Sequence, residues 1–177
     1  MVKLDLGCGD RTKEGFTGVD FYAGNGCKKV NLLKFPWPWK TNSVDEINCS
    51  HFFEHVPNRL RIPFMDEVWR ILKPEGKATF VTPYWSSPRA IQDPTHEWPP
   101  IAEQSYLYFN KKWREDNKLT HYLGKADFDF TYGYAVDAET ANKNVEAQAF
   151  HVKHYLNAVS DLQVNLVKRV PDVHDQH

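Results

Sequence analysis

The sequence predicts an α/β fold with a mostly parallel central sheet and an antiparallel strand at its C-terminal edge. In the first half of the chain, short β-like segments alternate with turns and one helical segment, an order typical of parallel sheets. The segment DFDFTYGY, residues 127–134, alternates in period two, which is typical of a half-exposed strand. The 177 residues suffice for one core, so residues 1–177 are expected to form a single domain.

Short strands are expected in the first half of the chain at residues 2–6, 16–20, 29–33, 43–50 and 77–82. Only nine residues separate Leu6 from Phe16, whereas a parallel crossover usually takes about ten to twelve or more. A full helix does not fit into this connection. The first crossover is therefore expected to be shortened to a loop or a single turn.

One helix is expected before the strand at 77–82. Pro63 suits the first turn of this helix, because that turn needs no backbone donor from it. Phe64 and Val68 begin an apolar face at helical spacing that continues to Leu72. The segment KPEG, residues 73–76, is expected to end the helix.

The second half is expected to begin with an irregular, aromatic segment. This segment, residues 84–126, contains one short helix near 103–108. Further elements are expected in the order strand 127–134, helix 138–157 and strand 162–170, with a flexible tail at 171–177.

Composition argues against several functional classes. The net charge of −1 offers no global positive field for a nucleic acid. No apolar run approaches the roughly 20 residues of a membrane span, so no membrane partner is expected. Cys8, Cys27 and Cys49 are odd in number and widely spaced, which suggests neither a disulfide framework nor a zinc knuckle. With no leader-like start, a cytoplasmic location is expected.

A glycine turn follows the first strand, and an acid closes the second. Glycines at positions 7 and 9 let a ligand approach the backbone closely, and Asp20 can accept hydrogen bonds from ribose hydroxyl groups. The third glycine of the dinucleotide fingerprint is absent, since Thr12 stands there. Asp20 also follows Gly9 by only eleven residues. The pattern therefore predicts a nucleotide-like cofactor without a pyrophosphate.

Four motifs in order carry a family resemblance: LDLGCG, GVD, NSVDEINCSHFFEHV and VWRILKPEGKATFVTP. Over about residues 3–110, the chain resembles class I S-adenosylmethionine-dependent methyltransferases, and among them the small type 11-like members with a shortened first crossover. The resemblance implies a Rossmann-like class I methyltransferase fold. It also implies S-adenosylmethionine as the cofactor and S-adenosylhomocysteine as the product.

The resemblance implies nine cofactor-binding residues: Asp5, Gly7, Cys8, Gly9, Asp20, Asn31, Leu32, Ser50 and His51. The first four would border the methionine part of the cofactor, and the last two would contact its amine through their backbone. Asp20 would hold the ribose. Asn31 departs from the family, which usually has an acid there to accept from the adenine amino group. Its amide oxygen can still accept one hydrogen bond.

The stretch HFFEH, residues 51–55, has an alternative interpretation as a zinc-binding helix with the H-x-x-E-H spacing. The preceding residues are β-like, and Pro57 follows closely, which leaves no room for the long helix of a metallopeptidase. No metal is therefore expected.

Residues 84–126 are expected to form a lid insertion that covers the substrate. Within it, His96 is the candidate catalytic base and Asp93 its orienting partner, because a histidine beside a carboxylate is suited to proton transfer near neutral pH. The alternative is that Asp93 only forms an Asx turn. Four tryptophans are candidates for an aromatic wall around a flat or sugar-like acceptor, with packing as the alternative: Trp37, Trp39, Trp85 and Trp98.

Together these observations predict a methyltransferase that moves a methyl group from S-adenosylmethionine to an oxygen or nitrogen atom of a small molecule or glycan. One alternative is a nucleic-acid or protein methyltransferase, which would need an extended basic face. Another is a non-catalytic module that binds S-adenosylmethionine, which Asn31 and the short first crossover would favour.

Overall fold

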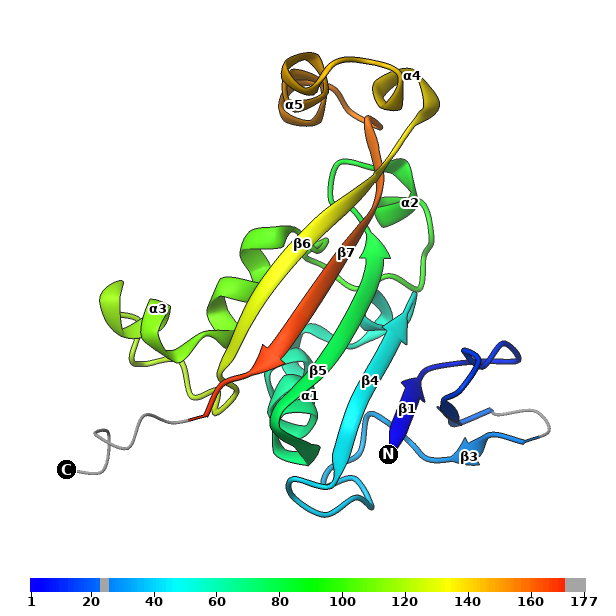
Figure 1. The fold of residues 1–177 in the computed structure, drawn as a ribbon, viewed down its shortest axis with the longest axis vertical. Helices are drawn as coiled ribbons and strands as arrows, with labels where there is room; N and C mark the ends of the chain where they lie inside the picture. Colours follow the sequence, from blue (N-terminus) through cyan, green and yellow to red (C-terminus); the bar gives the residue numbers. More distant parts are fainter. Residues whose placement is uncertain (23–25, 171–177) are drawn as a thin grey trace.

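A computed structural model describes residues 1–22 and 26–170 of the chain. The described residues form a seven-stranded sheet in the order β3-β2-β1-β4-β5-β7-β6 (Figure 1). The strands are β1 Lys3–Leu6, β2 Thr17–Asp20, β3 Lys28–Lys29, β4 Val44–Ser50, β5 Leu72–Pro83, β6 Phe128–Val136 and β7 Val159–Lys168. The tail predicted at 171–177 lies outside the described residues.

The predicted sheet is confirmed. Strands β1 to β5 pair in parallel, and β7 pairs in antiparallel fashion with both β5 and β6. The antiparallel strand is thus β7, and β6 forms the edge beside it. The first crossover, residues 7–16, contains only turns, as its length predicted.

The strand order reverses between β1 and β4. From β1 the chain proceeds outward to β2 and β3, whereas β4 and β5 lie on its other side. In open parallel sheets, ligands bind beyond the carboxyl ends of the strands at such a reversal. The turn at 7–9 after β1 and the residues after Ser50 in β4 therefore lie at the expected binding position.

The helix α1, Asn58–Ile71, begins earlier than predicted, so Pro63 lies inside the helix and not in its first turn. The first turn is fixed from outside the helix, because the Arg61 guanidinium donates hydrogen bonds to three backbone carbonyl groups. Leu60 also donates its backbone N–H to the Pro57 carbonyl at 2.7 Å. These contacts offset the hydrogen bond that a proline inside a helix removes.

The strand β5 also begins earlier than predicted, at Leu72, directly after α1. Leu72 pairs with Val44, and the next pair is Lys77 with Glu46. Residues 73–76, which were expected to end the helix, form a bulge between these two pairs. Glu75 has a φ of 60° there, in the left-handed region that suits such a local bend.

The remaining helices are α2 Pro88–Ile91, the 3₁₀ helices η1 Phe53–His55 and η2 Glu103–Phe109, α3 Lys111–Asp116, α4 Ala138–Ala141 and α5 Val145–His154. The helix predicted near 103–108 is confirmed as η2, whereas α2 and α3 were not predicted. The single helix predicted at 138–157 is wrong: Asp137 caps α4 and Asn144 caps α5, so two short helices form.

Three predicted strands change their boundaries. The strand predicted at 29–33 is only β3, because Asn31 accepts a hydrogen bond from the Leu33 backbone N–H at 2.9 Å and starts a turn. The strand predicted at 127–134 is β6, and the one at 162–170 is β7.

An aromatic cluster packs α1 and η2 against one face of the sheet. The Phe53 ring lies 5.4 Å from the Phe80 ring and 5.5 Å from the Phe64 ring, and Tyr106 joins them from η2. Helix α1 lies behind the sheet in Figure 1, and among the described residues no helix covers the near face of β4 to β7. None of the described helices is long and apolar enough to cross a membrane.

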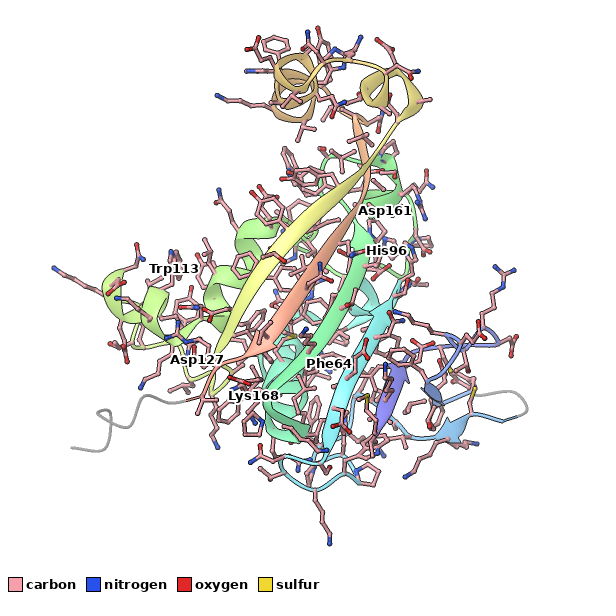
Figure 2. The ribbon with its side chains drawn as sticks, viewed as in Figure 1. Phe64, His96, Trp113, Asp127, Asp161 and Lys168 are labelled. Carbon is pink, nitrogen blue, oxygen red and sulfur yellow. The ribbon has the colours of Figure 1, made fainter. Side chains whose placement is uncertain are left out.

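Lys168 connects β7 to the C-terminal end of α1, at the end of the sheet opposite His96 (Figure 2). Only 5 % of Lys168 is exposed. Its Nζ donates to the Trp69 carbonyl at 2.7 Å, the Leu72 carbonyl at 2.8 Å and Asn42 Oδ1 at 2.8 Å. Two of these acceptors are carbonyl groups that the end of a helix leaves without an intrahelical partner.

Replacing Lys168 with methionine is expected to lower the free energy of unfolding by about 1–3 kcal/mol, because three acceptors lose their donor. Urea unfolding followed by circular dichroism measures this change. The control is Lys34→Met at an exposed position, which should stay within about 0.5 kcal/mol of the unmodified protein. Equal unfolding midpoints for the two variants would contradict the role of Lys168.

Candidate functional site

Two neighbouring cavities lie at the carboxyl ends of β1, β2 and β4. The glycine-turn cavity has a volume of about 520 Å³, and its lining includes Asp5, Gly7, Cys8, Ser50 and His51. The Asp20 cavity has a volume of about 310 Å³, and its lining includes Asp20, Asn31 and Leu32. Gly9 lines neither of the two, but its backbone N–H donates to Asp20 Oδ2 at 3.0 Å. The fold thus brings all nine predicted cofactor residues together.

Asp5 organises the glycine-turn cavity from beneath. It is buried, and its Oδ1 accepts from Asn48 Nδ2 at 2.7 Å while its Oδ2 accepts from the Lys13 backbone N–H at 2.7 Å. Lys13 Nζ in turn donates to Asn48 Oδ1 at 3.2 Å. Lys13 and Asn48 also line this cavity and were not among the predicted residues. Their contacts depend on long-range pairing that no local motif reveals.

Gly7 occupies a position that requires glycine. Its φ is 69°, and a Cβ atom built there would collide with the ring of Phe52. The Gly7 backbone N–H donates to the Val19 carbonyl at 2.8 Å, which ties the turn to β2. The close approach of Phe52 makes this ring a wall of the Asp20 cavity.

Asp20 presents its carboxylate at the mouth of the Asp20 cavity. Besides the bond from Gly9, its Oδ1 accepts from the Tyr22 backbone N–H at 2.9 Å. A carboxylate has about four lone-pair sites, so it keeps capacity for two ribose hydroxyl groups. Phe21, also missed by the sequence analysis, lines the same cavity with 43 % of its surface exposed. An aromatic residue directly after the acid is the local signal for it.

The side-chain oxygen of Asn31, the predicted acceptor, already uses one lone pair for a hydrogen bond within the protein. Its Oδ1 accepts from the Leu33 backbone N–H, and one lone pair of this oxygen remains for a ligand in the Asp20 cavity. The predicted single hydrogen bond to an adenine amino group therefore stays compatible with the geometry.

Cys8 and Cys27 lie side by side as free thiols, with their Sγ atoms 3.2 Å apart. Burial, followed by the contact with Cys27, raises the pKa of Cys8 to about 11. Cys8 therefore lines the glycine-turn cavity as an uncharged thiol near neutral pH and is not an activated nucleophile.

His51 turns the chain away from the sheet at the end of β4. Its φ of 53° lies in the left-handed region, and its backbone N–H donates to the Val81 carbonyl at 2.8 Å. The hydrogen-bonding contact with Glu54, 3.5 Å from His51 Nδ1, raises the pKa of His51. Because β4 ends at Ser50 and η1 covers only residues 53–55, His51 and His55 do not share the helix of the zinc interpretation.

A larger aromatic cavity of about 870 Å³ opens beyond β5. Its lining comprises Tyr84, Trp85, Ile91, Trp98, Pro100, Ala102, Glu103, Gln104, Tyr134, Val152 and Lys153. Trp98 is 74 % exposed and Trp85 is 50 % exposed, so large apolar side chains face the solvent here. Exposed apolar surface of this kind commonly marks a binding site.

Two of the four tryptophans proposed as an aromatic wall are placed elsewhere. Trp37 is buried in the core, its ring 5.0 Å from that of Phe64, and its indole N–H donates to the Leu32 carbonyl. Trp39 packs against Trp37 and beneath Lys28. Of the four, Trp85 and Trp98 line the aromatic cavity.

His96 and Asp93, the predicted catalytic pair, lie in the turn after α2. Asp93 Oδ1 accepts from the Thr95 backbone N–H at 2.8 Å, which is the Asx turn considered as the alternative. Its Oδ2 lies 3.8 Å from His96 Nε2. The His96 ring packs against His55 with 4.7 Å between ring centroids, and it lines none of the three cavities described above.

Comparison with known proteins agrees with this geometry. Residues 4–80 match the type 11 family described as "Methyltransferase domain". A structure of a SAM-dependent methyltransferase from Archaeoglobus fulgidus has a TM-score of 0.62 at 15 % identity, covering 94 % of this chain and 85 % of that one. An S-adenosylmethionine-dependent methyltransferase from Mesorhizobium loti has a TM-score of 0.50 at 18 % identity, covering 94 % and 90 %. No curated protein matches the sequence.

The fold, with two cavities at the strand reversal, is the Rossmann-like fold of these methyltransferase structures. The family match covers residues 4–80, less than half of the chain, and S-adenosylmethionine is the cofactor that this match implies. The fold alone does not define the reaction: the [4+2]-cyclase SpnF has a TM-score of 0.54 at 15 % identity, covering 95 % of this chain and 75 % of that one.

Replacing Asp20 with alanine is expected to abolish cofactor binding, because the carboxylate at the mouth of its cavity is lost. Thermal unfolding with S-adenosylhomocysteine tests this. A ligand at 100 times its Kd stabilises by about 2.7 kcal/mol, which should raise the Tm of a domain of this size by roughly 5–11 °C. The control Asp10→Ala, at an exposed position, should keep the shift. A full shift in Asp20→Ala would remove Asp20 from the site.

Proposed function

We propose that the protein transfers a methyl group from S-adenosylmethionine to a nitrogen atom of an amine-bearing small molecule held in the aromatic cavity. This narrows the sequence-based expectation of an oxygen or nitrogen atom of a small molecule or glycan. The observation that supports it is the carboxylate of Glu103 among the aromatic rings of this cavity.

Glu103 places a negative charge with unused hydrogen-bonding capacity in the aromatic cavity. Its Oε2 is buried and has no hydrogen-bond partner among the described residues. The pKa of the nearby Tyr84 is raised, chiefly by burial and further by the negative charge of Glu103. Lys153, on α5, is exposed where it lines the cavity. Although Tyr84 contacts the same side chain, Glu103 Oε2 keeps unused hydrogen-bonding capacity, so a donor or cation from a ligand would stabilise it.

Aromatic rings beside a carboxylate favour an amine for two further reasons. The faces of Trp85 and Trp98 attract positive charge electrostatically, by about 0.5–2 kcal/mol for each contact, and so stabilise the nitrogen of a neutral amine as it becomes cationic. In the transfer, the carbon–sulfur bond of the sulfonium breaks and the carbon–nitrogen bond forms, so positive charge moves from sulfur to nitrogen. A carboxylate near that nitrogen stabilises the charge as it develops and accepts the hydrogen bond of the remaining N–H.

The aromatic cavity and the glycine-turn cavity each include residues at the carboxyl end of one of two neighbouring strands. Tyr84 follows β5, and Ser50 and His51 follow the neighbouring strand β4. Arg89 and Asp161 form an ion pair at 2.7 Å, and their charges contribute to the pKa of His51 after β4. On the side of the aromatic cavity, the residue before Asp161 is Ser160, and its carbonyl group accepts a hydrogen bond from the Tyr84 backbone N–H. In this proposal, an acceptor in the aromatic cavity faces a methyl group presented beyond β4.

His96 is not assigned the proton in this proposal, because it faces His55 and lines none of these cavities. The proposal keeps the cofactor-binding role that the family resemblance implies for the nine residues around the glycine-turn cavity and the Asp20 cavity. Proximity and orientation supply most of the acceleration in this type of transfer.

Replacing Glu103 with glutamine is expected to lower kcat/KM for amine acceptors about 10- to 100-fold, which corresponds to losing a charge-assisted hydrogen bond. Formation of S-adenosylhomocysteine is measured with a panel of arylalkylamines, phenols and sugars. Cofactor binding should stay unchanged, and the exposed Glu115→Gln should behave as the unmodified protein.

Transfer to phenols or sugars but not to amines would contradict the nitrogen acceptor. Cofactor binding without transfer across the whole panel would instead favour a binding module. Transfer only to a nucleic acid or a protein would place the acceptor outside the aromatic cavity.

A further inference from the structure

Glu54, His55 and His96 come together although the first two lie in η1 and the third lies in the turn after α2. One possible ligand atom from each residue lies within 4.8 Å of the other two. The loop carrying His96 is held against η1, because the Glu97 backbone N–H donates to the Glu54 carbonyl at 2.9 Å. The cluster therefore rests on a fixed backbone connection between two separate segments.

The surrounding hydrogen bonds assign the protons of both histidine rings. His96 Nδ1 lies 3.2 Å from the Ala90 carbonyl, which can only accept. His55 Nδ1 lies 3.0 Å from Thr95 Oγ1 and 3.3 Å from the Thr95 carbonyl. Thr95 Oγ1 uses its own hydrogen for Asp93 Oδ1 at 2.7 Å, so it accepts from His55. Each neutral ring thus carries its proton on Nδ1 and leaves a bare lone pair on Nε2.

Glu54 adds a third acceptor to the cluster. Its residue is only 6 % exposed, and its Oε2 is buried without a hydrogen-bond partner among the described residues. Its other oxygen, Oε1, faces His51 at 3.5 Å. One possible ligand atom from each of the three residues therefore converges on a common point, an arrangement that a bound cation would stabilise.

From this geometry we propose that Glu54, His55 and His96 bind a divalent transition-metal ion of the zinc class. Two imidazole nitrogens and a carboxylate oxygen form a donor set that zinc accepts readily, and ligating histidines commonly donate their other N–H to a backbone carbonyl, as His96 does here. This site differs from the zinc helix considered for residues 51–55, because His96 replaces His51 as the second histidine ligand.

The distances suit a metal after a small closure. Bonds of about 2.0–2.2 Å in a tetrahedron place neighbouring ligand atoms about 3.3 Å apart, so the side chains must close by at most about 1.5 Å. Asp93 Oδ2 lies 3.8 Å from His96 Nε2, next to one of the three ligands. Rotation of the side chains alone provides a movement of this size.

The ion would fasten the loop at 92–98 to η1. Arg61 already donates to the carbonyl groups of Glu97 and Pro99 in this loop, at 2.9 Å and 2.6 Å. Trp98, two residues after His96, is a wall of the aromatic cavity. The metal ion thus has a structural role: it fixes the position of Trp98 in the wall of the aromatic cavity, and it takes no part in the methyl transfer.

The experiment measures metal content and metal-dependent stability in the full chain, produced without a histidine tag. The protein is stripped with EDTA, dialysed against micromolar Zn²⁺ and measured by elemental analysis, and Co²⁺ is added as a spectroscopic probe. The unmodified protein should hold one zinc per chain and show a Tm raised by roughly 5–11 °C when Zn²⁺ is at 100 times its Kd. Mg²⁺ should give neither effect.

The variants His55→Gln and His96→Gln should each lose the bound zinc and the Tm shift, whereas His121→Gln, at an exposed position, should keep both. Binding of S-adenosylhomocysteine serves as the folding check, because neither His55 nor His96 lines a cofactor cavity. Less than about a tenth of a zinc per chain in the unmodified protein, or full zinc retention in His96→Gln, would overturn the proposal.

Discussion

The buried carboxylate of Asp5 is the constraint on which the cofactor site depends. It joins three segments: β1, which carries it, the first crossover through the Lys13 backbone N–H, and β4 through Asn48. A helix would normally fill that crossover and hold it by its own hydrogen bonds, but only nine residues are present. Because a buried carboxylate is stable only when it is fully bonded, Asp5 and the loop must form together. The same hydrogen bonds of Asp5 also fix the position of the turn at Gly7.

Much of the fold could be predicted from the sequence because its signals are local. Glycine and proline mark the ends of strands, alternation reveals β6, and the count of residues between Leu6 and Phe16 excludes a helix. The errors arise where distant contacts override a local preference. Pro63 is tolerated inside α1 because Arg61 donates hydrogen bonds to the loop at 97–99 and holds the start of the helix. Trp37 is buried because its ring packs against that of Phe64.

The candidate site shows the same division between local and distant information. Residues of the glycine turn and the Asp20 cavity follow consecutive strand ends, so a pattern in the sequence places them. Glu103 had no such signal, since its cavity is built from the loop after β5, η2, β6 and α5. The catalytic interpretation of His96 rested on its neighbour Asp93, while the observed contacts of His96 also include His55 and the Ala90 carbonyl. Proximity in the chain suggested one partner, and the fold supplied others.

The uneven sheet has a consequence for how the molecule moves. Strands β5 and β7 are 12 and 10 residues long and pair over most of their length, whereas β2 has 4 residues and β3 has 2 exposed ones. Backbone amides in short edge strands exchange with solvent through local opening, and those in long central strands only through global unfolding. The Asp20 cavity therefore lies at the short-stranded end of the sheet, where local opening is expected to be easiest.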